Sequence, residues 1–198
     1  MFLIKEINQS EPYKLFERKF NEALNSGQKN INAIAISSLS KKKMEVDSRF
    51  VNLKYIVDDE WFFFTNYNSP KAKEFEEHNQ ISALLYWNKI DTQIRIKAKI
   101  KKTDNSFSDD HFSGRSKEKN ALAISSSQSQ KVEDFEIVKK KYKDVLQNMG
   151  DPKRPNYWGG FSFFPFYIEF WEGHKNRLNK RIAFKKDNNI WKKYLLEP

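Results

Sequence analysis

The segment from Thr65 to Lys71 contains residue types that bind anions. Ser69 is a favourable N-cap residue, and Pro70 suits the first position of a helix. The unpaired backbone amides at such a helix start, together with the charge of Lys71, attract a phosphate or a carboxylate. An ordinary capped helix without a ligand explains the same residues, so this segment alone leaves both interpretations open.

Two further groups of cations could carry chemistry. Arg49 and Lys54 lie in a stretch that alternates like a strand and otherwise looks buried, and buried charges need partners. A surface edge strand would explain them without a ligand. Arg177 and Arg181 follow Trp171 and could clamp a phosphate or stack on a ring, although a solvated basic turn is the commoner case.

The sequence excludes several classes of chemistry. It has no cysteine, which rules out disulfides, thiolate nucleophiles and cysteine-based zinc sites. The three histidines do not have the spacing of a metal-binding pair, so we expect no metal site. The six glycines form neither a Walker loop nor a dinucleotide-binding fingerprint. If the protein is an enzyme, we expect a cofactor to carry the chemistry.

The 198 residues carry a formal net charge of +10, but the lysines are spread along the chain and many adjoin acidic residues or asparagines. This layout is typical of solvated faces and argues against a nucleic-acid partner, while the field still attracts a small anion. No stretch is long and apolar enough to span a membrane, and the N-terminal apolar run is too short for a signal peptide. We therefore expect a cytoplasmic protein.

Apolar periodicity predicts a single α+β domain over residues 1–198, built on an antiparallel sheet or barrel. Helices are expected at residues 11–25, 106–112, 117–125 and 132–149, and a further helix begins near Pro70. Strands are expected at residues 31–39, 45–55, 61–65, 80–87, 93–101 and 161–171, followed by a hairpin of residues 182–185 and 190–196.

In order along the chain, several segments resemble the pyridoxamine 5′-phosphate oxidase family. The resemblance runs from about Pro12 to Pro198. Its most specific segments are Ser48–Lys54, Phe64–Lys71, Gln93–Arg95, Ser126–Gln130, Trp158–Gly160, Ile168–Gly173 and Asn176–Arg181. Several matches in the same order and at family-like spacing are much stronger evidence of a relationship than any one of these motifs.

The resemblance implies an antiparallel split β-barrel with flanking helices, and a homodimer that binds FMN at each subunit interface. It implies that the flavin is bound by Arg49, Lys54, Phe64, Thr65, Ser69, Lys71, Gln93, Gln128, Ser129, Trp171 and Arg181. It implies that a phosphorylated pyridine substrate is bound by Lys54, His111, Arg115, Lys119, Arg177 and Asn179, of which Arg177 and Asn179 occupy the catalytic positions.

The family reaction oxidises the 4′ amine or alcohol of the substrate to pyridoxal 5′-phosphate. The flavin accepts a hydride, and dioxygen then reoxidises it and yields hydrogen peroxide. The resemblance thus implies an oxidoreductase of vitamin B6 metabolism.

Four positions depart from the family pattern. Pro70 stands where the family usually has arginine, His111 replaces a tyrosine, and Lys119 replaces a serine. Asn179 replaces the histidine of an Arg-x-His motif and cannot titrate near neutral pH. The family's N-terminal extension, which supplies an arginine and a tyrosine, has no counterpart before Pro12.

These departures concentrate on the substrate side and leave alternatives open. One is a related flavin oxidase or reductase that acts on another anionic or heteroaromatic molecule. Another is a flavin-binding or pyridoxal phosphate-binding module without turnover.

Overall fold

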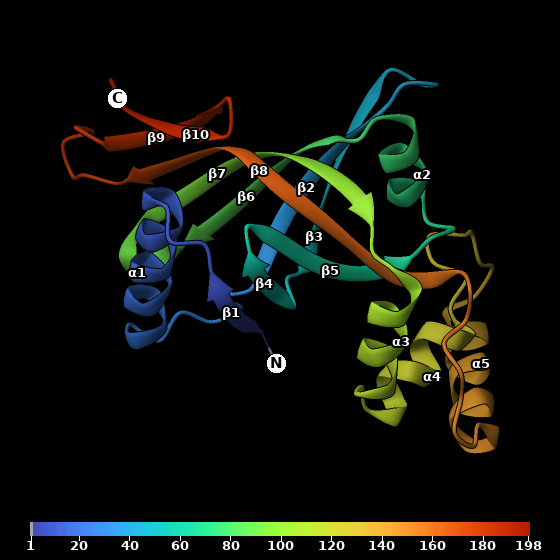
Figure 1. Cartoon of the computed structure of the whole chain (residues 1–198). Helices are drawn as coiled ribbons and strands as arrows, with labels where there is room; N and C mark the ends of the chain where they lie inside the picture. Colours follow the sequence, from blue (N-terminus) through green and yellow to red (C-terminus); the bar gives the residue numbers. More distant parts are fainter. Residues whose placement is uncertain (1) are drawn as a thin grey trace.

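A computed structural model describes residues 2–198, and its frame is one ten-stranded sheet within those residues (Figure 1). The strands are β1 (Leu3–Ile7), β2 (Ala33–Ser40), β3 (Glu45–Asn52), β4 (Tyr55–Asp58), β5 (Glu60–Asn66), β6 (Gln80–Trp87), β7 (Thr92–Lys102), β8 (Trp158–Glu172), β9 (Lys180–Asp187) and β10 (Ile190–Leu196). Their order is β1-β4-β5-β8-β7-β6-β2-β3, and β9 pairs with both β8 and β10. All of these pairings are antiparallel except that of β1 with β4, which is parallel.

The helices gather at two places on this sheet. They are α1 (Glu11–Asn25), α2 (Pro70–Glu77), α3 (Asn105–Ser113), α4 (Lys117–Ser125) and α5 (Phe135–Asn148), with a short 3₁₀ turn η1 (Asn88–Ile90). In Figure 1, α3, α4 and α5 lie together at one end of β8, and the β9–β10 hairpin lies at the other end. The strand β8 therefore links two regions that are far apart along the sheet.

Aromatic residues fill the interior. In α1, Tyr13 and Phe16 recur at helical spacing and are buried, and the ring centroid of Phe16 lies 4.6 Å from that of Trp61. A smaller apolar cluster of Phe112, Ala123 and Trp158 joins α3 and α4 to the start of β8. This second cluster attaches the helical group to the sheet.

The predicted α+β class with an antiparallel sheet is confirmed, and α1, α4, β6 and β10 have the predicted bounds. The other expected elements are present with ends shifted by a few residues. The exception is the expected strand 45–55, which is interrupted between Asn52 and Tyr55. The N-terminal strand β1 was not predicted, because five residues give too short a periodic signal. That residues 1–198 form one domain stays a prediction.

The interpretation of residues 45–55 as an otherwise buried strand is wrong. Most of β3 is exposed, including Phe50 at 75%. The strand lies at one end of the strand order and, within residues 2–198, pairs only with β2, so its outer edge is unpaired. Arg49 is half-buried on β3, and Lys54 lies in the interruption before β4.

The apolar stripe of the last predicted helix is also not in the core. Its helix, α5, has no buried residue, and Phe135 is 65% exposed. The helix packs mainly against α4, so only one side of it is in contact with the protein. Within residues 2–198, no helix is both long enough and apolar enough to pass through a bilayer.

We expect Gly159→Ala to lower the free energy of unfolding by about 1–3 kcal/mol, because overpacking costs that much in a dense interior. An added Cβ would clash with the Tyr67 hydroxyl and lie 2.7 Å from Cζ of the same ring. That hydroxyl donates to the carbonyl of Gly160, so the ring cannot move without loss of this bond. Urea unfolding followed by circular dichroism measures the change.

The matched control is Gly150→Ala, whose Cβ would meet no atom within 4 Å. This variant should unfold within about 0.5 kcal/mol of the parent. Equal stability of the two variants would contradict the packing argument at Gly159.

Candidate functional site

Lys71 is a buried ammonium group near the start of α2. Its Nζ donates to Thr65 Oγ1 at 3.0 Å and to Ser69 Oγ at 3.3 Å. Among residues 2–198, no carboxylate oxygen lies within ion-pair distance of it. Burial, and then the charge of Arg49, lower the pKa of Lys71 to about 8, against the opposing effect of Glu74. An anion beside Nζ would relieve this cost.

Ser69 occupies the N-cap position of α2, as predicted, but its hydroxyl does not bond to the backbone amides of the helix. Its hydroxyl instead donates to the carbonyl oxygen of Asn66 at 2.7 Å, and no side chain caps the helix. The Asn66 side chain accepts a bond from the backbone of Asn68 at 2.7 Å, which shapes the turn before the helix. The start of α2 therefore has no side-chain acceptor of its own.

Arg49 approaches the same region from β3. Its Nη2 lies 3.1 Å from Glu74 Oε2, and its Nη1 donates to the Ser38 hydroxyl, which in turn donates to Glu74. Glu74 is buried, so Arg49 supplies its counter-charge. Since Lys71 is not paired to a carboxylate, Lys71, Arg49 and Glu74 together carry a net positive charge, and the only further carboxylate within ion-pair distance of the two cations among residues 2–198 is the exposed Asp47, 3.9 Å from Arg49 Nη2.

Gln128 reaches Thr65 from the loop that follows α4. Its Oε1 accepts from Thr65 Oγ1 and from the backbone amide of Asn66, both at 3.3 Å. Ser129 follows it, exposed and with φ of 67°. Beside Gln128 lies a cavity of about 310 Å³, lined by Phe64, Thr65, Asn66, Arg115, Lys119, Leu122, Ala123, Ser126, Gln128 and Trp158.

His111 stacks against the aromatic wall of this region. Its ring lies parallel to Phe64 with centroids 3.6 Å apart, and Trp158 is nearly parallel at 6.2 Å. Its Nδ1 lies 2.7 Å from the Tyr55 hydroxyl. Burial, followed by the charges of Arg115, Lys54 and Lys119, lowers the pKa of His111 to about 4, so the ring is neutral at neutral pH.

Three cations, Arg115, Lys54 and Lys119, lie near enough to His111 to lower its pKa. The Arg115 guanidinium lies 4.3 Å from the Trp158 ring centroid, and its Nη2 donates to the carbonyl of Lys119 at 2.9 Å. Its Nη1 is buried without a partner among residues 2–198. Burial lowers the pKa of Arg115 to about 10, and burial with the charges of Lys119 and Arg115 lowers that of Lys54. The donor set therefore fits an anion.

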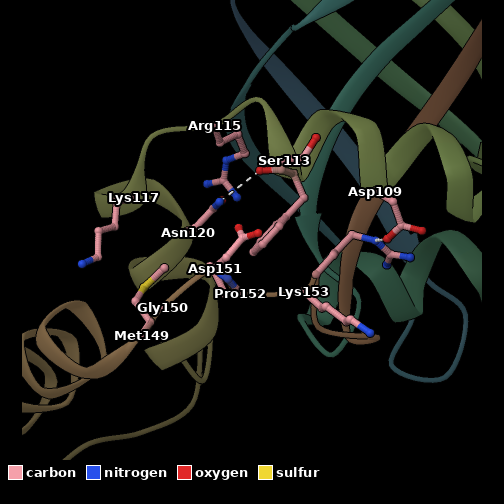
Figure 2. A pocket seen from close by; sticks show the side chains of 12 residues that line it. Asp109, Ser113, Arg115, Lys117, Asn120, Met149, Gly150, Asp151, Pro152 and Lys153 are labelled. Carbon is pink, nitrogen blue, oxygen red and sulfur yellow. Dashed lines mark hydrogen bonds and ion pairs between the residues drawn. The ribbon is translucent and has the colours of Figure 1, made fainter.

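Arg115 also borders a larger cavity of about 650 Å³ between α3, α4 and the segment before β8 (Figure 2). Arg154 closes one side of this cavity, because it donates to Asp109 at 2.7 Å and to the carbonyl of Trp158 at 2.7 Å. Arg115 is thus common to the linings of both cavities.

A third group of predicted residues lies at the opposite end of β8. Gln93, Trp171 and Arg181 are direct neighbours across β7, β8 and β9. Trp171 and Trp158 lie at the two ends of β8, which corresponds to on the order of 40 Å of extended chain. One chain therefore does not bring this group to the Lys71 and His111 clusters.

Glu169 holds Arg181 in this third group. Its Oε1 accepts from Arg181 Nε at 2.9 Å and lies 2.8 Å from Nη2, and Tyr167 donates to its Oε2 at 2.7 Å. Burial alone would raise the pKa of Glu169. The bonds from Tyr167 and Arg181, with the charge of Arg95, instead hold it below its ordinary value.

The predicted catalytic residues lie in the loop between β8 and β9. Arg177 is exposed, with φ of 60°. The side-chain oxygen of Asn179 accepts from the backbone of His174 at 3.1 Å, which leaves its amide nitrogen available as a donor. Both residues belong to the hairpin end of the sheet.

Comparisons with known proteins find relatives of one family along almost the whole chain. A family model described as pyridoxamine 5′-phosphate oxidase matches residues 19–149, and one described as the pyridoxine 5′-phosphate oxidase C-terminal dimerisation region matches residues 158–198. A pyridoxine/pyridoxamine 5′-phosphate oxidase of Leptospira interrogans is 32% identical over 96% of this chain and 89% of its own length. One of Colwellia psychrerythraea is 34% identical over 96% and 88%.

The chain belongs to the pyridoxamine 5′-phosphate oxidase family. The crystal structure of PhzG from Burkholderia lata, in complex with tetrahydrophenazine-1-carboxylic acid, has a TM-score of 0.90 at 28% identity over 96% of this chain and 93% of its own. An FMN binding protein of Nostoc punctiforme has a TM-score of 0.73 at 11% identity, which supports the fold alone. The expected split barrel is therefore confirmed, and oxidoreductases of this family are its relatives.

The two family models together cover residues from both ends of the sheet. The first covers Lys71, His111 and Gln93, and the second begins at Trp158 and covers Trp171 and Arg181. The ordered motifs used for the resemblance therefore lie in the regions that the family shares.

Several residues of these clusters were not predicted from the sequence. Glu74 follows Lys71 by three residues on one helix face, a spacing that could have suggested contact. Ser38, Tyr55 and Glu169 had no such signal, since they meet Arg49, His111 and Arg181 only through the sheet. Local patterns do not encode such contacts.

We expect Lys71→Met to raise the free energy of unfolding of the ligand-free protein at pH 7 by about 1–3 kcal/mol, since it removes a buried ammonium that lacks a carboxylate. The pKa of Lys71 is lower in the folded state, at about 8, than its ordinary value of 10.5. The unfolded chain therefore binds more protons between these values, and the parent gains stability as the pH rises through them.

The advantage of Lys71→Met should thus be complete below pH 8 and shrink toward pH 10.5. Chemical denaturation at pH 7 and pH 10 measures it. Lys73→Met on the exposed side of α2 is the control and should change little at either pH. A destabilised Lys71→Met protein would contradict the argument.

Proposed function

We propose that the protein is an FMN-dependent oxidase that converts pyridoxamine or pyridoxine 5′-phosphate to pyridoxal 5′-phosphate. The observation that carries this proposal is the cavity of about 310 Å³ in which Arg115 and Lys119 lie beside the aromatic wall of Phe64 and Trp158, with the ring of His111 stacked on Phe64. A phosphate ester attached to a flat ring fits such a set, because the cations bind the phosphate and the aromatic wall packs on the ring. Curated relatives of that activity, at 32–34% identity, support it.

The Lys71 cluster would bind the phosphate of FMN. Lys71 and Arg49 supply charge, and the start of α2 supplies the backbone amide of Lys71, because the amides of Ala72 and Lys73 already donate to the carbonyl of Ser69. Ser69 and Ser129 would add hydroxyl donors. When bound, FMN supplies the acceptor for a hydride from the 4′ carbon of the substrate.

The remaining flavin contacts would come from both ends of the sheet. Thr65, Phe64 and Gln128 line the 310 Å³ cavity at the helical end. Gln93, Trp171 and Arg181 lie together at the hairpin end. Glutamine side chains match the mixed donors and acceptors of a flavin ring edge.

On the substrate side, the protein would bind the phosphate and orient the ring. Lys54, Arg115 and Lys119 would hold the phosphate, and the buried Nη1 of Arg115 would gain its missing partner. Arg177 and Asn179 would close over the ring and hold the 4′ carbon against the flavin. The substrate loses two electrons, which reduce dioxygen to hydrogen peroxide. Water then hydrolyses the imine formed from the amine to aldehyde and ammonia.

We also propose that the protein is a homodimer in which each site combines the helical end of one chain with the hairpin end of its partner. The separation of these groups along β8 supports this arrangement, as does the match of residues 158–198 to a dimerisation region. Exposed apolar side chains on β3 and β6, the two strands that flank β2, offer a surface for association, namely Val46, Phe50, Leu84 and Tyr86.

A second candidate is the oxidation of another anionic heteroaromatic molecule. The similar structure of PhzG contains tetrahydrophenazine-1-carboxylic acid, a carboxylate on a fused ring system. A carboxylate would use the same cations, and Asn179 suits a reaction that needs a hydrogen bond but no titrating group at that position.

For the first candidate, we further propose a role in vitamin B6 metabolism in the cytoplasm.

We expect Arg49→Ala to weaken FMN binding roughly tenfold or more, because a charge-assisted contact to the phosphate is lost. The parent protein should be purified yellow or take up added FMN stoichiometrically. Fluorescence quenching of FMN titrated with the apoprotein measures the dissociation constant.

The control for this experiment is Lys73→Ala, which removes one exposed positive charge from α2 and should leave FMN affinity within about twofold. A colourless protein that binds no FMN would remove the flavin proposal. Equal weakening of FMN binding by both variants would show that the overall positive charge of the protein attracts FMN, without a specific contact from Arg49.

For the FMN-loaded protein, we expect anaerobic addition of pyridoxamine 5′-phosphate to bleach the flavin absorbance, because two electrons pass to the cofactor. Admission of air should restore the colour and release hydrogen peroxide. Stopped-flow absorbance and a peroxide assay measure the two steps. Arg177→Ala should keep the flavin but bleach it at least tenfold more slowly.

Tetrahydrophenazine-1-carboxylic acid is tested in parallel. Bleaching by this compound alone would favour the second candidate. A flavin that stays oxidised with both compounds would exclude both named activities.

A further inference from the structure

Tyr55 is the first residue of β4 and lies against His111. Its ring packs edge-on against Phe62, Phe64 and Phe107, with centroids between 5.7 and 6.5 Å apart. The same ring meets the His111 imidazole at 89°, and its hydroxyl lies 2.7 Å from Nδ1. The phenol is therefore held by packing from several sides, and its hydroxyl has a fixed direction.

The direction of this hydrogen bond follows from the available acceptors. Burial raises the pKa of Tyr55, so its hydroxyl keeps its proton at neutral pH. Among residues 2–198 this hydroxyl has no acceptor other than His111 Nδ1. A neutral imidazole has one N–H donor and one acceptor nitrogen. If Nδ1 accepts from Tyr55, the ring proton lies on Nε2.

We propose that Tyr55 is a positioning residue that holds His111 as a neutral Nε2–H donor for the anionic group of the substrate. This inference rests on the proposed function, since it places the substrate anion among Lys54, Arg115 and Lys119. Nε2 has no hydrogen-bond partner among residues 2–198, so it is available to a ligand there.

A neutral donor suits this place better than a fourth cation. Burial is the largest cause of the lowered pKa of Lys54, and the charges of Lys119 and Arg115 lower it further, so these three cations already repel one another. An imidazolium at His111 would add to this repulsion, whereas an N–H group adds a hydrogen bond to the anion without further charge. The stack on Phe64 fixes the ring plane, and Tyr55 fixes which nitrogen carries the proton.

The tautomer can be observed directly by long-range ¹H–¹⁵N spectra of the full-length ligand-free protein at pH 7.5. The chain has three histidines, and His111→Gln identifies the His111 signals by their loss. We expect a protonated Nε2 and an unprotonated Nδ1 in the parent. In Tyr55→Phe the two tautomers should mix. A parent protein with the proton on Nδ1, or with a mixture, would overturn the inference.

The consequence for binding is tested with pyridoxal 5′-phosphate titrated into the FMN-loaded protein by calorimetry. We expect Tyr55→Phe to weaken binding about three- to tenfold, the effect of one hydrogen bond. Tyr13→Phe is the matched control, because it also removes a phenol hydroxyl, here one that donates to Asp59 in the core. Its affinity should equal that of the parent.

A double-variant cycle separates positioning from direct contact. In a His111→Ala background, Tyr55→Phe should have no further effect on pyridoxal 5′-phosphate affinity. An equal loss in both backgrounds, or no loss in the parent background, would overturn the inference. If the parent binds no pyridoxal 5′-phosphate, the proposed substrate fails, and the tautomer in the ligand-free protein still decides the role of Tyr55.

Discussion

Positive charge without matching negative charge, held at the helical end of β8, is the constraint on which the site depends. Lys71, Arg115 and Lys54 all have lowered pKa values, and burial is the largest cause in each case. Proteins normally pair buried cations with carboxylates, but here hydroxyl and carbonyl groups are the partners of Lys71 and Arg115. Such an arrangement costs stability in the free protein, and a bound anion would remove that cost.

The stability cost of a buried cation is smaller where a carboxylate is present. Glu74 pairs with Arg49 beside Lys71, and Glu169 binds Arg181 at the other end of the sheet. These two arginines are thereby fixed in direction, whereas Lys71 and Arg115 retain unused binding capacity. A carboxylate thus fixes the side-chain direction of two of the proposed flavin ligands, while Lys71 and Arg115 have no carboxylate partner among residues 2–198.

The sheet decides which groups can act together. The antiparallel pairing of β7 and β8 places Gln93 beside Trp171, and that of β5 and β8 places Asn66 beside Trp158. Because β8 separates these two ends, one chain presents two incomplete sets of residues. An association of two chains through the exposed side of the sheet is the simplest way to unite them, and the family relationship supports it.

The substrate side shows how a departure from a family pattern is accommodated. The family resemblance predicts a tyrosine at the position of His111, and a neutral imidazole supplies an equivalent donor only in one tautomer. Burial, followed by the neighbouring cations, keeps the ring neutral, and in our proposal the hydroxyl of Tyr55 decides which nitrogen carries the proton. One physical effect thus sets the charge of the His111 side chain, and a second sets the position of its proton.

The sequence by itself determined the α+β class, most helices and strands, and the family, because periodic patterns and ordered motifs are local signals. It also predicted that Thr65 and Lys71 lie close together, because they are only six residues apart and the turn into a helix lies between them. Only the tertiary structure decided that β3 is exposed, that the Ser69 hydroxyl donates to Asn66 and not to the backbone of α2, and that Gln128 meets Thr65. The reason is that burial and long-range hydrogen bonds depend on which strands are neighbours, and strand order is not written in any one segment of the chain.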